Sequence, residues 1–511
     1  MNNEQYDLIV VGAGSGGNIA ALAAAKQGFR TLLLEKHNIT GGTGSSFRRG
    51  RFEFDTALHQ LYGITNDYKG EKGHLRKVLE ALDVYDKVDF ITQKETFRLA
   101  MGDQLSVSVP GSYEGFKNLL KQIIPAEADA IDAYQTLCDK AGEEFHKLVD
   151  FTAHNREISK EEFPVLFEYG SRMTKDLLEE FFKHPLVIGI YSTYYGYLGI
   201  PVEICPFFNL ALCYERGQGT SYIKGGVAEL SAAVTAEFEA SKGTVLTGAD
   251  VDQILVEDGQ VQGVHLRDGR VFRAPIVISN ISKIRTYVDL IDQKQIPEQV
   301  FADLRVSQPS QSIFVVYLGL DISAEESGIQ DETSFCRNVS DPSIMFANRY
   351  DVNLRTDHLS SVEISCYNVD NPDASPEGTC IVSILASKNP DWFLICPPEE
   401  YTKRKDEYLE EVLNFLYQYY PKVKGHIEEI ECATPVTLMR YLGSPNGSVY
   451  GVDAHWKDMI ANKMEFDSPI RGFYFCGASV FVGGFNNCML SGKAVVDKVL
   501  SDQKQQKGEQ A

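Results

Sequence analysis

The first 35 residues contain two apolar runs with a glycine-rich turn between them. Residues 6–11 are apolar and β-branched, Gly12-Ala13-Gly14-Ser15-Gly16-Gly17 fits G-x-G-x-x-G, and residues 16–27 are rich in alanine. Residues 30–35 form a second apolar run that ends in Glu35, which lies 18 residues beyond Gly17. A strand, a helix and a second strand in this order are typical of a dinucleotide-binding βαβ unit.

Each part of this pattern has a physical role. Gly12 permits the tight turn, Gly14 lets a pyrophosphate approach the backbone, and Gly17 lets the helix pack on the strand. Ser15 and Gly16 lie at the helix N-terminus, which faces the phosphates. We expect the Glu35 carboxylate to accept hydrogen bonds from the adenosine ribose and to repel a 2′-phosphate, and we place Lys36 beside it; the simpler alternative is that Glu35 is a surface acid.

Size and charge restrict the class of protein. The 511 residues suggest two or three lobes, and the net charge of -22 opposes binding to nucleic acid. Ten cysteines are scattered from Cys138 to Cys488 with no CxxC pair and no metal-like spacing, which favours reduced thiols and predicts no metal. The start of the chain lacks a signal-peptide pattern, and no apolar run reaches about 18 residues. These features predict a cytoplasmic protein and leave peripheral membrane contact open.

The remaining pattern predicts an α/β fold in which a Rossmann-like, dinucleotide-binding domain is interleaved with other parts. We assign 1–90, 218–285 and 465–500 to that discontinuous domain, 91–217 to a mainly helical lid, and 286–464 to an α+β substrate domain. Residues 501–511 are expected to be a flexible tail. Strands are expected at 244–246, 251–256, 263–266, 271–279, 311–320 and 473–476, and helices at 225–242, 398–420 and 486–500.

One stretch, 186–212, is rich in aromatic residues and has almost no charge beyond Glu203. Its aromatic residues are Tyr191, Tyr194, Tyr195, Tyr197, Phe207 and Phe208. Such a segment could line an apolar cavity or meet a membrane surface. The equally weighted alternative is that it forms part of the core.

Further glycine motifs carry a family resemblance. Gly41-Gly42 follows Glu35 after six residues, as in glutathione-reductase-like flavoproteins. Gly225-Gly226 starts a helix that leads to 276–280, and residues 472–479 precede Gly483-Gly484. With segments 54–59 and 312–320 and the Thr434-Pro435 pair, in this order, the chain resembles the phytoene desaturase, carotenoid isomerase and retinol saturase family.

The resemblance implies an FAD site built from separated segments. It places Gly41, Gly42 and Thr43 beside the cofactor, Val251 and Asn280 in the second segment, and Gly477, Ala478, Gly484 and Asn486 near the flavin ring and ribityl chain. Two positions depart from the family pattern. Thr43 stands where many desaturases have an arginine, so no arginine contact to the pyrophosphate is inferred there, and Ala57 stands where retinol saturases often have glycine.

The resemblance also implies the chemistry. FAD supplies hydride exchange at N5, and the protein must hold the substrate carbon there and exclude water. We expect saturation, desaturation or cis-trans isomerisation of a lipophilic polyene or isoprenoid-like substrate, with a separate electron donor or acceptor. His59 and Tyr222 are the candidates for proton transfer, although a structural role for either is the alternative. A flavin amine or amino-acid oxidase and a non-enzymatic flavin-binding scaffold are the competing functions.

Overall fold

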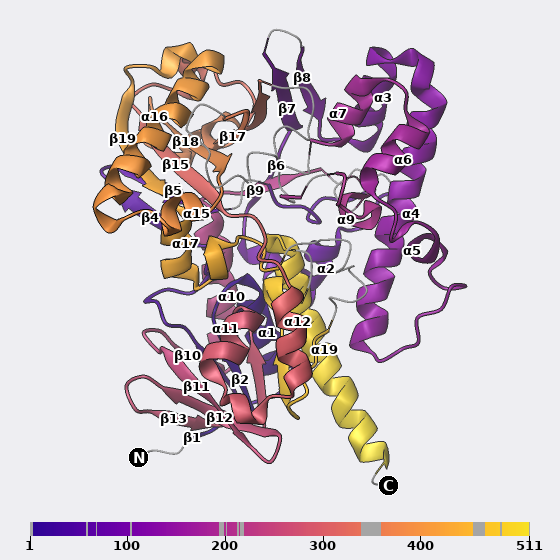
Figure 1. Cartoon of the computed structure of the whole chain (residues 1–511), viewed down its shortest axis with the longest axis vertical. Coiled ribbons are helices and arrows are strands. Elements are labelled where there is room, and N and C mark those ends of the chain that lie inside the picture. The colour runs from indigo at the N-terminus through magenta and orange to yellow at the C-terminus, as the bar shows by residue number, and fades with distance from the viewer. Residues whose placement is uncertain are drawn as a thin grey trace.

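The computed structural model describes residues 4–57, 60–67, 69–102, 105–193, 199–200, 202–211, 214, 219–338, 359–452, 465–480 and 483–509. Figure 1 shows a lower part that contains both chain termini, an upper part built on a large sheet, and a group of helices along one side. Two features singled out from the sequence lie outside the described residues: His59, and tyrosines 194, 195 and 197 of the aromatic stretch.

The lower part is built on a five-stranded parallel sheet with the order β10-β3-β2-β14-β20. Its strands are β2 (Leu8–Val11), β3 (Thr31–Leu34), β10 (Thr244–Leu246), β14 (Ile276–Ser279) and β20 (Phe473–Phe475). Every residue of β2, β3 and β14 is buried, as expected for parallel strands covered on both faces. The βαβ unit expected at the N-terminus is confirmed.

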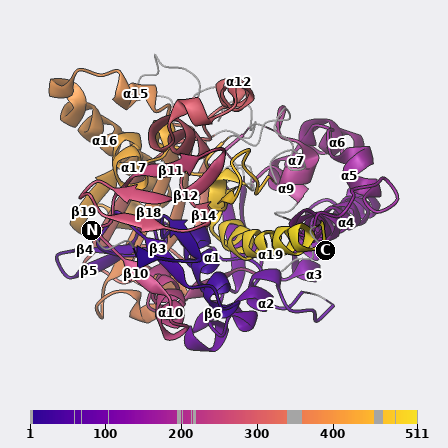
Figure 2. The same ribbon diagram turned by 90° about the horizontal axis from the view of Figure 1, so that it is seen from below.

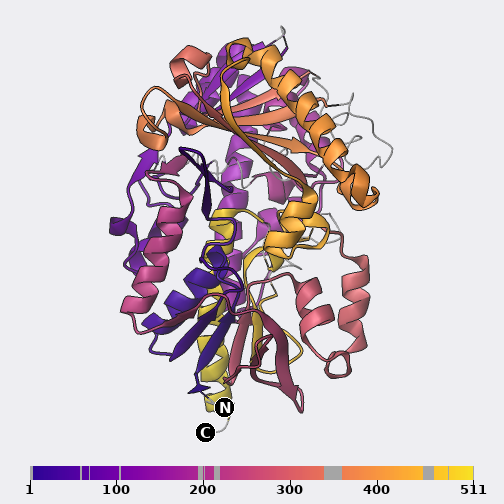
Figure 3. The same cartoon turned by 90° about the vertical axis from the view of Figure 1, so that its left-hand side faces the viewer.

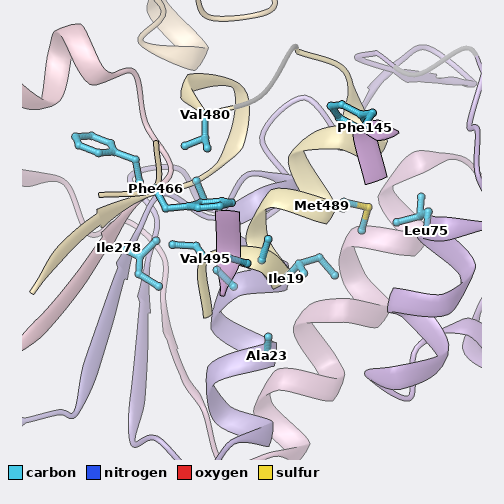
Figure 4. Packing of buried hydrophobic residues seen from close by; sticks show 14 of the residues in the cluster. Ile19, Ala23, Leu75, Phe145, Ile278, Phe466, Val480, Met489 and Val495 are labelled. Atoms are coloured by element: carbon cyan, nitrogen blue, oxygen red, sulfur yellow. The ribbon is translucent and has the colours of Figure 1, made fainter. Parts of the chain in front are cut away.

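Three helices complete this domain: α1 (Ser15–Lys26), α10 (Val227–Ala240) and α19 (Phe485–Glu509). Figure 4 shows Ile19 and Ala23 of α1 in the same buried cluster as Val495 of α19 and Ile278 of β14. The N-terminal and C-terminal helices of the chain therefore share one core.

The predicted strand 271–279 is two strands. β13 (Val271–Arg273) pairs with β1 (Glu4–Gln5) and β12 (Gln260–Leu266), and β12 pairs with β11 (Val251–Glu257), in a separate four-stranded sheet. Pro275 stands between β13 and β14, and because proline has no N–H it does not continue a ladder of hydrogen bonds. The chain changes sheets at this proline.

The upper part contains a seven-stranded sheet with the order β19-β15-β18-β17-β16-β7-β8. Its strands are β7 (Glu95–Met101), β8 (Leu105–Pro110), β15 (Ile313–Leu320), β16 (Thr333–Arg337), β17 (Ser361–Cys366), β18 (Cys380–Ser387) and β19 (Ile427–Ala433). Helix α16 (Tyr401–Tyr419) covers one face, where Tyr408, Val412 and Leu416 join the buried side chains of the sheet.

The expected lid, 91–217, thus contributes two strands to this sheet before it becomes helical. Its helices are α3 (Tyr113–Ile123), α4 (Ala128–Ala153), α5 (Pro164–Tyr169), α6 (Thr174–Phe181), α7 (Pro185–Tyr191) and α9 (Phe207–Ala211). Figure 2, a view from below, shows these helices gathered on the side of α19 away from the sheets. The alternating pattern of residues 105–110 is the local signal for the strand that the sequence analysis missed.

Shorter elements connect these parts. They are β4 (Ser46–Arg49), β5 (Phe52–Asp55), β6 (Phe90–Thr92), β9 (Ser221–Ile223), α2 (His74–Ala81), α11 (Lys283–Arg285), α12 (Glu298–Val306), α13 (Ala324–Ser327), α15 (Asp391–Leu394) and α17 (Pro435–Leu442). Figure 3 shows both termini at one end of the molecule and the large sheet at the other. None of the described helices is long and apolar enough to span a membrane.

Residues 501–509, which were expected to belong to a flexible tail, continue α19 as helix. Asp502 anchors this extension, since it accepts a hydrogen bond from Tyr474 Oη at 3.0 Å and pairs with Lys498 Nζ at 2.7 Å. Lys498 is buried and also contacts Asp467 at 2.7 Å. A buried ammonium that needs acidic partners holds the end of the helix in place.

Candidate active site

The glycine turn has the geometry that the sequence predicted. Gly12 adopts a φ of +92°, a conformation that favours glycine, and the helix begins directly after Gly14. A Cβ atom on Gly17 would lie 2.0 Å from the carbonyl oxygen of Gly12, so any larger residue would separate α1 from the turn. Gly12, Gly14 and Ser15 line one cavity at the N-terminus of α1, where backbone N–H groups favour an anion.

The Gly41-Gly42 turn lies directly against this loop. Gly41 N donates a hydrogen bond to Ala13 O at 2.7 Å, and a Cβ atom on Gly42 would lie 3.0 Å from Gly14 Cα. Gly42 and Thr43 line the same cavity. The predicted second turn beside the cofactor therefore meets the first one in space.

Glu35 directly follows β3, beside the glycine turn. Its carboxylate accepts hydrogen bonds from Ala13 N and His37 N, both at 2.9 Å, and it lines the cavity. A carboxylate has about four acceptor positions, so capacity remains for the hydroxyls of a ribose. Glu35 is only 7% exposed and bonds the turn itself. Both observations argue against the alternative that it is a surface acid.

Asn280 has a packing role that its sequence position did not reveal. Its side chain occupies the space that several glycines leave open: a Cβ atom on Gly14, Gly16 or Gly477 would lie within 2.9 Å of an Asn280 side-chain atom. Asn280 also lines the cavity, as predicted for a cofactor contact. One side chain thus joins the N-terminal and C-terminal parts of the site.

The C-terminal segment closes the site from the other side. Gly477 has a φ of +76° and its N–H donates to Ser491 Oγ at 2.7 Å, while Ala478, Gly484 and Asn486 line the cavity. Gly16 faces the backbone of α19, because a Cβ atom there would lie 2.8 Å from Cys488 O. Burial raises the pKa of the Cys488 thiol to about 12, although a hydrogen bond from Ser15 opposes the shift.

Cationic side chains are present despite the threonine at position 43. Thr43 offers its carbonyl to Thr56 Oγ1 at 2.8 Å, whereas Lys36 and Arg285 line the cavity beside Glu35. Burial lowers the pKa of Lys36, and the nearby Arg285 adds to this effect. Arg285 was missed because it follows β14 in a segment with no recognisable motif. Val251, the other predicted contact, lines the cavity at the start of β11.

The described residues fit a dinucleotide such as FAD. Two glycine turns, an acid at the end of the second strand and two helix N-termini face one cavity. A Cβ atom on Gly12 or Gly14 would lie 2.9 Å from a neighbouring side chain, so these glycines leave no space for a larger residue. Neutral backbone donors and two cations suit a diphosphate, and the buried acid suits a ribose. All the predicted cofactor residues except Gly16, Gly17, Gly41 and Gly477 line the cavity directly, and those four shape its walls.

The cavity, of about 540 Å³, continues from this cradle to the large sheet. Its wall there consists of neighbouring residues on one face of the sheet. One cross-strand row joins Val315, Leu385, Glu363 and Phe335, and the next contains the pairs Ile313–Ser387 and Ser361–Arg337. Residues of the helical insertion form the opposite wall: Tyr113, Phe116, Gln135, Phe145, His146, Asn209 and Tyr214. The cavity therefore lies between sheet and insertion.

The described part of the aromatic stretch 186–212 follows the core alternative rather than the cavity alternative. Tyr191, Phe207 and Phe208 are fully buried in the core of the insertion and do not line the cavity. Tyr191 stacks on Phe182 with a centroid distance of 5.3 Å. These three residues therefore do not form a cavity lining. Among the described residues of the stretch, Asn209 reaches the cavity.

Tyr222, a predicted proton-transfer residue, is not among the residues that line the cavity. Its hydroxyl donates to Asp55 Oδ2 at 2.6 Å, and its ring stacks on Tyr367 at 4.6 Å. Asp55 also accepts a hydrogen bond from Val227 N at 3.0 Å, at the N-terminus of α10. Burial raises the pKa of the Asp55 carboxyl to about 6, although both hydrogen bonds oppose the shift. This geometry favours the structural alternative for Tyr222.

Comparison with known proteins covers almost the whole chain. Residues 10–82 match the model of an NAD(P)-binding Rossmann-like domain. An all-trans-retinol 13,14-reductase of Danio rerio is 25% identical, with 94% of this chain and 84% of the relative aligned. Prolycopene isomerase 2 of an Oncidium hybrid cultivar is 27% identical, with 98% of this chain and 84% of the relative aligned. Over most of its length the chain is thus similar to a retinol reductase and a prolycopene isomerase.

Solved structures confirm the fold of this chain. An oxidoreductase from Methanosarcina mazei matches with a TM-score of 0.65 and 16% identity, over 96% of this chain and 99% of the other. A putrescine oxidase matches with a TM-score of 0.63 and 13% identity, over 98% and 99%. The predicted Rossmann-like domain with an interleaved second domain is therefore the observed architecture.

Proposed function

We propose that this protein is an FAD-dependent oxidoreductase that acts on carbon–carbon bonds of a lipophilic, polyene-like substrate. The observation that carries the proposal is the continuous cavity, which joins the dinucleotide cradle to a space between the large sheet and the helical insertion. The names of the relatives, a retinol reductase and a prolycopene isomerase, support the substrate class.

One end of the cavity binds the nucleotide, and the other end holds the substrate. Glu35 and the glycine turns bind the nucleotide, and the N-terminus of α19 closes the cradle. Bound FAD supplies a centre that exchanges a hydride with substrate. Ile313, Val315 and Leu385 on the sheet and Phe116 on the insertion form apolar walls that hold a hydrocarbon chain and exclude water from it.

The source of a proton stays a prediction. His59 remains a candidate on the strength of the family-like segment 54–59, and Tyr222 is the weaker one because its hydroxyl is committed to Asp55. A separate electron donor or acceptor, a cytoplasmic location and peripheral membrane contact are likewise proposals. The electron partner rests on the single G-x-G-x-x-G motif and the absence of a CxxC pair, the location on the scattered cysteines, and the membrane contact on the charge-poor stretch 186–212.

Anaerobic turnover tests the proposed function. Chemically reduced holoprotein is mixed with retinol, prolycopene or an unsaturated fatty acid, the flavin spectrum is followed, and products are separated by chromatography. Saturated or isomerised product is expected with at least one polyene. No product and no flavin reoxidation with any of them would contradict the proposal, and hydrogen peroxide release with a panel of amines would favour the amine oxidase instead.

A further inference from the structure

A short helix of the upper part lies against the cofactor cradle. Helix α17 follows β19 of the large sheet, and Figure 1 shows it where the upper and lower parts meet. It ends at Leu442, and Gly443, with a φ of +68°, turns the chain out of the helix. The last carbonyl groups of a helix have no partner within the helix and carry a partial negative charge. This end of α17 therefore attracts hydrogen-bond donors and cations.

The two residues after Glu35 supply such donors. Lys36 Nζ donates to the carbonyl oxygen of Arg440 at 3.4 Å, and His37 Nε2 donates to that of Tyr441 at 2.6 Å. The ring of Tyr441 also stacks on the ring of His37, with 5.8 Å between the centroids and 28° between the planes. The end of α17 is thus bound to the cradle directly beside the acid that suits a ribose.

The same end of α17 forms part of the cavity wall. Three segments line the cavity here: residues 36–37, residues 249–251, and Leu438, Tyr441 and Leu442 of α17. The first two segments are neighbours, because Gly248 N donates to His37 O and Ala249 N donates to Glu35 O, both at 2.8 Å. Tyr441 is 54% exposed, so its contact with His37 leaves much of the ring uncovered.

The covalent order of a dinucleotide predicts which group lies against this wall. The ribose of adenosine is joined to the phosphates on one side and to the adenine base on the other. The turn from Gly12 to Ser15 favours the phosphates, and Glu35 suits the ribose. The base therefore continues past Glu35, away from the turn. Residues 36–37, residues 249–251 and Tyr441 line the cavity beyond Glu35.

We propose that Tyr441 binds the adenine ring of the cofactor, so that the upper part of the molecule completes the nucleotide site. A tyrosine ring stacks on a base through its π face, and His37 positions this ring through their contact and the hydrogen bond to the Tyr441 carbonyl. The bound nucleotide then touches both parts of the protein at its adenosine end. The inference rests on FAD as the cofactor and goes beyond the proposed polyene chemistry.

Binding of ADP to the full-length protein freed of flavin tests this inference without turnover. ADP carries the adenine, the ribose and the diphosphate but no flavin, and calorimetric titration gives its Kd. Tyr441→Ala should raise this Kd about 5- to 150-fold, the range expected for the stacking of one base on an aromatic ring. Tyr441→Phe keeps the ring and should bind ADP as the wild type does. His37→Ala should raise the Kd by a smaller factor, because it removes the positioning residue and keeps the ring.

A matched control separates contact with the base from a general effect on folding. Phe167 of α5 is also 54% exposed and does not line the cavity, so Phe167→Ala should leave the Kd of ADP unchanged. Without ligand, Tyr441→Ala should unfold at the same thermal midpoint as the wild type. Saturating ADP should then raise that midpoint less in Tyr441→Ala than in the wild type.

The wild-type protein provides a second measurement that needs no variant. Nitration of Tyr441 by tetranitromethane, followed by mass spectrometry, should slow several-fold when ADP is bound. An unchanged Kd in Tyr441→Ala, nitration that ADP does not slow, or no binding of ADP by the wild type overturns the inference. A protein that shows the expected effects at Tyr441 but converts no polyene would keep this inference and reject the proposed function.

Discussion

Asp55 should make the stability of this protein depend on pH in a direction opposite to that of most carboxylates. Its side chain is buried among the hydroxyl of Tyr222, the N–H of Val227 and the core around Tyr367. Burial raises the pKa from 3.8 to about 6. Because the folded-state pKa exceeds the unfolded-state value, the contribution to stability is complete at low pH and is lost as the pH rises through about 6.

The magnitude follows from the shift. A change from 3.8 to about 6 corresponds to about 3 kcal/mol over the whole titration, of which roughly 1.4 kcal/mol is lost between about pH 5 and pH 7.5. Asp55→Asn removes the titration but keeps an oxygen that accepts from Tyr222 and Val227 N. The variant should therefore gain stability relative to the wild type as the pH rises.

Equilibrium urea unfolding at the two pH values, followed by far-ultraviolet circular dichroism, measures this difference. Asp289→Asn is the control, since that side chain is 58% exposed, and its difference from the wild type should stay the same at both pH values. A constant difference for Asp55→Asn, or a wild-type protein that gains on the variant at higher pH, would refute the assignment of a raised pKa to Asp55.

Three further predictions concern the cradle and the last helix. Gly17→Ala should purify with little bound flavin, because its Cβ would lie 2.0 Å from Gly12 O. The control Gly189→Ala, with no atom within 4 Å of its Cβ, should keep full flavin absorbance. Equal flavin content in the two variants would contradict the packing of Gly17 on Gly12. Glu35→Gln should weaken FAD binding to the apoprotein by about 10-fold in a calorimetric titration, because a charged acceptor is lost, and an unchanged Kd would rule out its role. Asp502→Ala should lower the free energy of unfolding by about 1–3 kcal/mol, because the buried Lys498 loses one of its two acidic partners and keeps only Asp467. Lys504 is exposed, and Lys504→Ala should leave the urea midpoint unchanged.

Local patterns in the sequence predicted the cofactor cradle well. The turn at Gly12, the close approach at Gly17 and the position of Glu35 all depend on residues near one another in the chain. The spacing of these residues in the sequence therefore predicts their arrangement. Gly477 and Gly484 were found through the family resemblance, because nothing in the local sequence says that α19 packs on α1. The division at Pro275 was readable in principle, since proline lacks the N–H of a continuous ladder.

The substrate end of the cavity could not be read in the same way. The row of Val315, Leu385, Glu363 and Phe335 depends on pairings between distant strands, and β16 pairs in parallel with β7 from another predicted domain. The two alternatives for the aromatic stretch could not be separated from the sequence, because apolar residues without charge suit a core as well as a cavity. Arg337 ends an ordinary strand, and only the fold shows that its side chain is buried beside Thr193.

The contact between α1 and α19 has a consequence for biosynthesis. Gly16 and Gly492 approach so closely that a Cβ atom on Gly492 would lie 2.2 Å from Gly16 O, which means that the first and the last helix complete one compartment. Because domains of a growing chain fold from the N-terminus onward, the early βαβ unit emerges from the ribosome long before its final wall is made. Cofactor capture thus belongs to the finished polypeptide, and a prematurely terminated chain carries the recognition sequence without a compartment that retains the nucleotide.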